Sequence, residues 1–299
     1  MSLTGEIPIV PLRTWGRWVS ATVILILVGA ILFGLSHAKL KWRDIPKFFF
    51  SSTMIEKGLV GTVVLAIACM ALGIVLGVFI AILRNSKNPV ASWCAWFYIY
   101  IFRGLPTLLQ LFIWFNLALA FKTIGIPGLF HWSTNSVMTP FVVALLGLGL
   151  NESAYYAEIV RAGFNSVDHG QVEAAHSIGM TPMKTMRRVI LPQAMRVIIP
   201  PTGNDFINML KGTSLASTVS YFELLQSAAN IYSANFEIME ALMAAALWYM
   251  ILVSVASIGQ HFIERRFGAD RSNGNSMGQS VRRGLNPVAF LRRNAAVQV

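Results

Sequence analysis

The sequence is short of charged residues. Only 12% of its 299 residues are Asp, Glu, Lys or Arg, whereas 55% are hydrophobic, and the mean hydropathy is +0.60. A soluble domain has about a quarter of its residues charged, so these values exclude an ordinary soluble domain and indicate a chain folded in a bilayer. The length allows several membrane spans of about 20 residues each, but no second large soluble domain. We expect one all-α, multi-spanning membrane domain.

Cysteine is scarce as well. The only two cysteines, Cys69 and Cys94, lie in or beside apolar runs. No Cys/His spacing resembles a zinc site. We therefore expect neither a disulfide framework nor a metal site.

Motifs that would let this chain catalyse a reaction on its own are also missing. The sequence has no G-x-x-x-x-G-K-[ST] phosphate-binding loop, so we expect any nucleotide hydrolysis to come from another chain. It has no H-E-x-x-H motif and no nucleophile elbow in a recognisable context, which argues against a membrane protease or hydrolase. We expect no catalytic residues and no cofactor bound by this chain.

The charges that are present are mostly basic. The chain has 24 Lys and Arg against 13 Asp and Glu, which gives a formal net charge of +11. An integral membrane protein places such residues in loops that face the cytoplasm and anionic lipid. Topology explains this charge better than nucleic-acid binding does, so we expect no nucleic-acid partner.

Apolar runs identify five membrane spans. Each run is long enough to cross a bilayer as a helix. The run 137–159 is apolar only up to Leu150 and then continues through the polar Asn151-Glu152-Ser153. The spans are 19–35, 59–83, 96–121, 137–159 and 239–262.

A sixth span, 194–209, follows from the distribution of charge. It contains Pro200, Pro201 and Asp205, and it would fail a simple hydropathy threshold. If Arg13 at the N-terminus is cytoplasmic, five spans would leave the arginine-rich tail outside. The positive-inside rule therefore favours six spans with both termini in the cytoplasm. The tail arginines are Arg265, Arg266, Arg271, Arg282, Arg283, Arg292 and Arg293.

The first span and the loop after it admit other interpretations. The 19–35 run exceeds the 7–15 residues usual in a signal peptide, so a retained helix is preferred to cleavage. The loop 37–57 is placed outside by alternation, although it holds five Lys and Arg residues. Its basic character has no explanation from topology.

The loop 165–192 reads NSVDHGQVEAAHSIGMTPMKTMRRVILP and predicts two short helices. Asp168 is placed to cap the first helix, and Gly179 supplies the left-handed residue that ends it. Thr181-Pro182 begins the second helix, which is basic on one side and apolar on another, and Leu191-Pro192 leads into the next span. By spacing alone, the loop is equally well a simple connector or a docking site for another protein.

A resemblance separates these two readings. Glu173-Ala174-Ala175, then Gly179, then Leu191-Pro192, resemble the EAA motif of permeases in ATP-binding-cassette importers, with Val189 where isoleucine is usual. Four more stretches are similar to the branch of that family that carries polar amino acids. These are FRGLPTLLQL (102–111), AYYAEIVRAG (154–163), LPQA (191–194) and KGTSLAS (211–217). Leu105, Asn151-Glu152 and Gly212 depart from the pattern.

The resemblance covers the chain from Leu59 to Arg266 and implies an architecture. It implies an N-terminal helix and external loop (1–57), a five-helix type I permease core (58–266) and a basic cytoplasmic tail (267–299). Such a chain is a multi-pass protein of the bacterial inner membrane. It works with a second permease chain, identical or homologous.

The resemblance also implies a function and partners. The family imports amino acids such as histidine, glutamine, glutamate, arginine and opines into the cytoplasm. An extracytoplasmic binding protein delivers the substrate, and a dimer of ATPase subunits binds ATP and Mg²⁺. Each EAA loop fits a cleft on one ATPase, where Glu173 would meet basic groups and Gly179 permits the turn.

Charged residues at membrane depth are candidates for the substrate pathway, because each needs a partner, water or a ligand. Arg103 precedes Pro106, which can open a kink, and Thr107, Gln110 and Asn116 follow at turn-like intervals that could line a cavity. Arg103 is suited to bind a substrate carboxylate through two hydrogen bonds.

Acidic residues offer a place for the substrate ammonium group. Glu152 or Asp205 is suited to that role, and Asn204 lies next to Asp205. In the alternative, Arg103 pairs within the protein, and Asn204 and Asp205 hold helices together. Glu158 is expected at the cytoplasmic mouth beside Arg161.

The rival function is a stand-alone secondary carrier or channel. Arg103, Glu152 and Asp205 would then couple ions to solute. The six predicted spans show no inverted repeat, which argues against a secondary carrier. Such a carrier also needs no EAA-like loop. Uptake by the purified chain alone in liposomes would favour the carrier.

Overall fold

The computed structural model describes residues 15–37, 40–126 and 130–267. The chain divides into two units, 1–42 and 43–299, and each is described by itself. The first contains α1 (Trp15–His37), an apolar helix that includes the predicted span 19–35. Arg13 and nearly all of the tail 267–299 lie outside the described residues.

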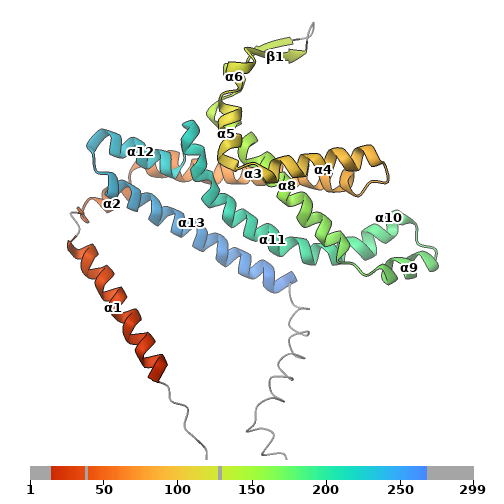
Figure 1. The fold of residues 1–299 in the computed structure, drawn as a ribbon, viewed down its shortest axis with the longest axis horizontal. Helices are drawn as coiled ribbons and strands as arrows, with labels where there is room; N and C mark the ends of the chain where they lie inside the picture. The colour runs from red at the N-terminus through yellow and green to blue at the C-terminus, as the bar shows by residue number, and fades with distance from the viewer. Residues whose placement is uncertain (1–14, 38–39, 127–129, 268–299) are drawn as a thin grey trace, which may run out of the picture. The chain divides into compact units, whose positions relative to one another are not determined.

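Four long helices form the centre of the second unit (Figure 1). They are α3 (Val60–Arg84), α8 (Pro140–Asn165), α11 (Leu191–Gly212) and α13 (Ile238–Phe267). The predicted spans 59–83, 137–159, 194–209 and 239–262 are therefore confirmed as helices. The shorter elements are α2 (Ile45–Phe49), η1 (Thr53–Leu59), α4 (Pro89–Gly104), α5 (Thr107–Phe115), α6 (Leu117–Ala120), β1 (Thr123–Ile126), β2 (Phe130–Ser133), α7 (Thr134–Val137), α9 (His169–Ser177), α10 (Pro182–Thr185), η2 (Met186–Ile190), η3 (Thr213–Val219) and α12 (Leu224–Asn235).

The predicted span 96–121 is not one continuous helix. The range holds α4, α5 and the short α6, and α4 and α5 meet at an angle of 100°. Proline disfavours a helical conformation in the residue before it, and Leu105 is accordingly extended (φ −91°, ψ 137°). A continuous apolar run does not reveal such a break.

Among the described residues, two helical segments are long and apolar enough to cross a membrane alone, by length and composition. They are Thr53–Arg84 and Ile238–Arg266, and the bent pair α4–α5 counts as a third if it is one span. The polar residues of α8 and α11 distinguish these helices from the other two. The count of six spans and its orientation stay predictions.

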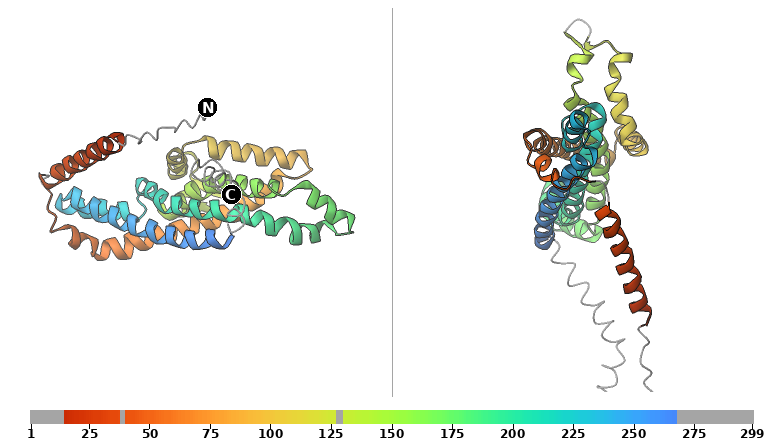
Figure 2. Two further views of the ribbon diagram at one scale, coloured as in Figure 1. Left: turned by 90° about the horizontal axis from the view of Figure 1, so that it is seen from below. Right: turned by 90° about the vertical axis from the view of Figure 1, so that its left-hand side faces the viewer.

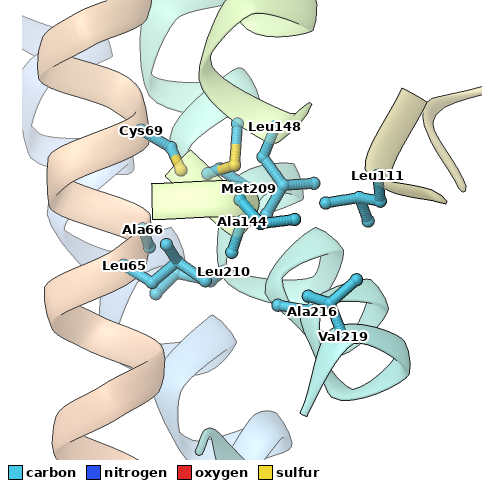
Figure 3. Packing of buried hydrophobic residues seen from close by; sticks show 11 residues of the cluster. Leu65, Ala66, Cys69, Leu111, Ala144, Leu148, Met209, Leu210, Ala216 and Val219 are labelled. Carbon is cyan, nitrogen blue, oxygen red and sulfur yellow. The ribbon is translucent and has the colours of Figure 1, made fainter. Parts of the chain in front are cut away.

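The core lies where α3, α8, α11 and η3 meet (Figure 3). Glycines let α3 approach α8 closely, because a Cβ at Gly73 would lie 2.8 Å from Glu152 Cγ and one at Gly77 would lie 2.8 Å from the Ser153 carbonyl oxygen. The Gly73-x-x-x-Gly77 pair therefore serves packing within one chain. The labelled side chains in Figure 3 are Leu65, Ala66, Cys69, Leu111, Ala144, Leu148, Met209, Leu210, Ala216 and Val219.

A second cluster joins α2, α12 and one end of α13. Phe49 stacks on Trp248 with ring centroids 4.5 Å apart, and Trp248 Nε1 donates to the Phe49 carbonyl at 2.9 Å. The fully buried Glu223 caps α12 by accepting from Leu225 N at 2.9 Å, and it also accepts from the Tyr249 hydroxyl. The basic segment after α1 is thus helical in part and packed on α13.

Two further features lie at the edges of the second unit. The predicted loop 122–136 contains an antiparallel hairpin, in which Thr123 of β1 pairs with Ser133 of β2. The hairpin projects away from the bundle in Figure 1 and in the right-hand view of Figure 2. Helices α9 and α10 project beyond the ends of α8 and α11, on the side away from α12.

Candidate functional site

The break between α4 and α5 is held by side-chain amides. Because Pro106 has no N–H, the Phe102 carbonyl four residues earlier loses its helical donor. Gln110 Nε2 donates to that carbonyl at 3.0 Å, and Asn151 Nδ2 of α8 donates to it at 2.6 Å. Gln110 Nε2 also donates to the Leu105 carbonyl at 3.0 Å. These bonds fix the end of α4 against α5 and α8.

A pocket of about 530 Å³ lies beside this break, between α4 and α8. Its volume falls within the range usual for small-molecule sites. Trp96, Tyr100 and Tyr155 give it aromatic walls, and Arg103 stands at its end on α4. The full lining is Arg84, Trp96, Ile99, Tyr100, Arg103, Gly104, Tyr155, Glu158 and Arg161.

The charges of the pocket are three arginines and one glutamate. Glu158 pairs with Arg161 at 2.6 Å, as the sequence predicts, and Arg161 Nε also donates to both carboxylate oxygens. The Arg103 guanidinium lies over the Tyr155 ring, 4.9 Å from its centroid, and makes no salt bridge with any described residue. Such a pocket has an excess of positive charge and suits a ligand with a carboxylate.

Of the seven predicted pathway residues, Asn116 included, the structure brings only Arg103 into this pocket. Gln110 is 3% exposed and satisfies the carbonyls at the break. Thr107 Oγ1 donates to Asn151 Oδ1 at 3.4 Å, next to the same break. Both side chains therefore support the position of Arg103.

Glu152 and the residues of α11 lie elsewhere. Glu152 packs against Gly73 of α3, and its Oε1 has no hydrogen-bond partner within the described part of the chain. Asp205 of α11 lies within electrostatic range of Glu152, and Asn204 is exposed. The three residues do not line the Arg103 pocket.

Helical spacing could have found the residues that the sequence analysis missed. Trp96, Tyr100 and Arg103 follow one another at intervals of four and three, so they share one face of α4. Tyr155, Glu158 and Arg161 share one face of α8 at intervals of three. These faces are polar or aromatic where lipid-facing positions would be aliphatic.

The loop after α8 confirms the predicted caps. Asp168 Oδ1 accepts from Gly170 N at 2.6 Å at the start of α9. Gly179 has φ +77°, and Met180 N donates to the Ala175 carbonyl at 3.0 Å across the turn. Thr181 takes the N-cap position of α10 but makes no side-chain capping bond.

The predicted passage from the loop into the next span at Leu191-Pro192 is confirmed. Helical structure runs without interruption from α10 through η2 into α11, and these two residues are the first of α11. Proline is tolerated in the first turn of a helix, where its missing N–H is not needed. The loop therefore ends in one continuous helical rod with α11.

The loop presents three kinds of surface. Glu173 and Ala174 are exposed, whereas Ala175 is 5% exposed and faces the core. Ile178 and Met183 are 79% and 75% exposed. A basic cleft of about 560 Å³ is lined by Met183, Lys184, Arg187 and Arg188.

Comparisons with known proteins agree with this architecture. Residues 73–269 match the family model of the binding-protein-dependent transport system inner membrane component. The arginine transport system permease protein of Corynebacterium glutamicum is 42% identical over 260 residues, which are 86% of this chain and 82% of that protein. The L-cystine transport system permease protein of Bacillus subtilis is 40% identical over 226 residues, which are 75% of this chain and 90% of that protein.

A solved structure gives the same result. The crystal structure of an amino acid ABC transporter with histidines matches with a TM-score of 0.66 and 32% identity, over 76% of this chain and 99% of that one. The chain therefore belongs to the binding-protein-dependent transport system inner membrane components, the membrane permease subunits of ATP-binding-cassette importers.

Proposed function

We propose that this permease moves polar α-amino acids into the cytoplasm and that Arg103 binds the substrate carboxylate. One observation carries the assignment: a guanidinium without a salt-bridge partner among the described residues lies over an aromatic ring in a pocket large enough to admit an amino acid. The relatives named for arginine, cystine, octopine and nopaline share this class of substrate. The carboxylate is the group that these substrates have in common.

Each wall of the pocket has a role in this proposal. Arg103 can donate two parallel hydrogen bonds to a carboxylate, and the Tyr155 ring holds its guanidinium plane. Glu158 is the acidic side chain of the pocket and is assigned the ammonium group, which would share its carboxylate with Arg161. Trp96 and Tyr100 give the ligand an aromatic wall on α4.

Direct binding tests the pocket without the binding protein. The purified permease–ATPase complex would be incubated with radiolabelled L-arginine, L-histidine, L-cystine and L-glutamine. Arg103→Ala should weaken the binding of every ligand that the wild type retains by about tenfold or more, because a charge-assisted bidentate contact is lost. Lys87→Ala, at an exposed position after α3, is the matched control. Unchanged dissociation constants in Arg103→Ala and Arg103→Lys would refute the carboxylate assignment.

The second part of the proposal concerns coupling. The loop 165–192 docks on a separate ATPase dimer, which holds ATP and Mg²⁺, while this chain binds no cofactor. Its exposed Glu173, its apolar Ile178 and Met183 and its basic cleft are the contact surface. Ala175 and the Gly179 turn hold α9 in place, and the rod through Leu191-Pro192 carries the movement into α11.

Replacement of Glu173 tests the docking. Glu173→Ala should reduce copurification of the ATPase and ATP-dependent uptake, while the permease keeps its thermal stability. His169→Ala, exposed on the same helix, is the control. Normal assembly and uptake in Glu173→Ala would contradict the assignment of this surface.

The remaining partners complete the proposed importer. We propose a second permease chain, identical or homologous, and an extracytoplasmic binding protein that delivers the substrate. The assembly would lie in the bacterial inner membrane with both termini of this chain in the cytoplasm. Uptake by the purified chain alone in liposomes, without the ATPase, would instead support a secondary carrier or channel.

A further inference from the structure

Gln260 of α13 makes a buried hydrogen bond to another helix. It is 6% exposed, and its Nε2 donates to the Pro200 carbonyl of α11 at 2.8 Å and to Glu264 Oε1 at 3.0 Å. The residues Pro200 and Gln260 are 60 positions apart in the chain. Its Oε1 has no hydrogen-bond partner within the described part of the chain, so the two bonds of Nε2 are what hold this buried amide. The bond to Pro200 therefore defines one relative position of the two helices.

The opposite helix provides space for this side chain. A Cβ built on Gly203 would overlap the Gln260 amide. Gly203 does not need its glycine for backbone conformation, because it lies inside the regular helix α11. Its missing side chain forms a notch for Gln260, one turn beyond Pro200.

The contact lies where α11 is weakest. Pro200 and Pro201 remove two backbone donors from the middle of the helix, yet helical structure continues from Leu191 to Gly212. Helices usually kink at such positions unless neighbouring groups support them. Gln260 does not replace either lost donor, but its bond to the Pro200 carbonyl holds α13 against this part of α11.

The contact also lies close to the coupling loop. The rod formed by α10, η2 and α11 reaches Pro200 about 14 Å after Leu191, from the rise per residue of a helix. At its other end, α13 packs against α2 and α12 in the cluster around Trp248. A movement that enters through the rod can reach that cluster through the packing of α11 on α13, and the Gln260 contact is a fixed point of that packing.

We propose that Gln260 is a positioning residue that ties α13 to α11 at Pro200, so that movement of the coupling loop is passed to α13. This inference rests on the proposed docking of the loop. Gln260 touches neither the pocket nor the loop, and it acts through the rigidity of α11. Without the Gln260 hydrogen bond, ATP hydrolysis and transport should both continue. Fewer amino acids should then be transported for each ATP that is hydrolysed.

The test is the ratio of uptake to ATP hydrolysis in proteoliposomes that contain the complete importer and the retained amino acid. Gln260→Ala and Gly203→Ala should each lower this ratio by about fivefold, the lower end of usual coupling between sites. Gln260→Met keeps the bulk of the side chain without its amide, so it should show the same loss with little change in assembly. Gln226→Met, whose amide bonds only Asn230 on its own helix, is the matched control.

The double variant separates positioning from packing. In Gly203→Ala/Gln260→Ala the new methyl group has no amide to displace, so the thermal midpoint should recover relative to Gly203→Ala. The ratio of uptake to ATP hydrolysis should not recover, because the hydrogen bond from Gln260 to Pro200 is absent. Recovery of both, or an unchanged ratio in Gln260→Met, would overturn the proposal. Failure of the proposed function is visible separately, as a wild type without ATP-dependent uptake.

A distance measurement gives a readout that does not depend on substrate. Spin labels at exposed Asn208 of α11 and Ile258 of α13 require replacement of the exposed Cys94 by serine, whereas Cys69 is buried. The distance between the labels should stay constant between nucleotide-free and ATP-bound complexes, and it should change with nucleotide in Gln260→Ala. A distance that changes with nucleotide in the wild type would contradict the proposal.

Discussion

The two proline sites of the core have opposite outcomes. At Pro106 the chain leaves the helix, and α4 and α5 meet at 100°. At Pro200 and Pro201 helix α11 continues without a break. Buried amide side chains donate to a backbone carbonyl near each proline site, but with a difference. Gln110 and Asn151 donate to Phe102, the carbonyl that loses its helical donor at Pro106, whereas Gln260 donates to the carbonyl of Pro200 itself.

The difference lies in where the amide donors come from. At Pro106, Gln110 follows on α5 itself, and its bond to the Leu105 carbonyl requires the bent conformation. At Pro200 the donor comes from the neighbouring helix α13, so the bond fixes α13 against α11 at the prolines. Proline weakens a helix in both cases, but only at Pro106 do side-chain amides replace the lost helical donor. The bent site holds a pocket, whereas the continuous site holds a contact between two helices.

The largest effect is expected from removing both donors at the bent site. Gln110→Leu/Asn151→Leu leaves the Phe102 carbonyl without a donor, which should cost about 3 kcal/mol of stability or more. Each single variant keeps one donor to this carbonyl, so each should cost about 1 kcal/mol. The thermal midpoint of the purified complex should therefore fall by more than the sum of the single changes.

Asn116→Leu is the matched control for this pair. Asn116 Nδ2 donates to the Phe112 carbonyl at 2.8 Å, but that carbonyl also accepts from the Asn116 backbone N–H at 3.0 Å. The control should leave the midpoint nearly unchanged. Additive effects of Gln110→Leu and Asn151→Leu would show that the two amides do not share the Phe102 carbonyl as a common partner.

A smaller effect on stability, but a clear effect on binding, is expected for Pro106→Ala. The substitution returns a backbone donor to Phe102 and relieves Leu105 of the steric bias before proline. The free energy of unfolding should change by about 1 kcal/mol or less. Arg103 would shift relative to Tyr155, so ligand binding should weaken by about tenfold.

Binding of the retained amino acid to the purified complex measures this change. Pro46→Ala is the control, because Pro46 lies at the start of α2, where no helical donor is lost. Unchanged binding in Pro106→Ala would mean that Gln110 and Asn151 alone set the bend.

Local chemistry made part of this structure predictable. The Asp168 cap, the left-handed Gly179 and the Glu158–Arg161 pair depend on residues within a few positions of one another, and all three were predicted. The sequence also indicated that Pro106 could open a kink. It did not predict the size of the bend, because Asn151 is 49 residues away from Phe102.

Non-local contacts account for what the sequence analysis missed. Gln110 was expected in the substrate pathway, but its amide is occupied by carbonyls that become available only when the helix breaks. The fully buried Glu223 depends on Tyr249 of another helix, and Gln260 depends on a notch in α11. Composition indicates that such polar residues need partners, but it does not identify the partners.

The smallest effect, and the sharpest test of the comparison, is expected from Pro200→Ala. In the wild-type background this change restores a backbone donor to α11, so it should leave uptake per ATP nearly unchanged and keep or raise the thermal midpoint. In the Gln260→Met background it should recover part of the lost ratio, because a stiffer α11 needs less support from α13. Pro106→Ala in the same background should recover nothing, since Pro106 lies on another helix. If Pro200→Ala leaves this ratio unchanged in Gln260→Met, the Gln260 hydrogen bond sets the distance between α11 and α13. It then has no influence on the bending of α11.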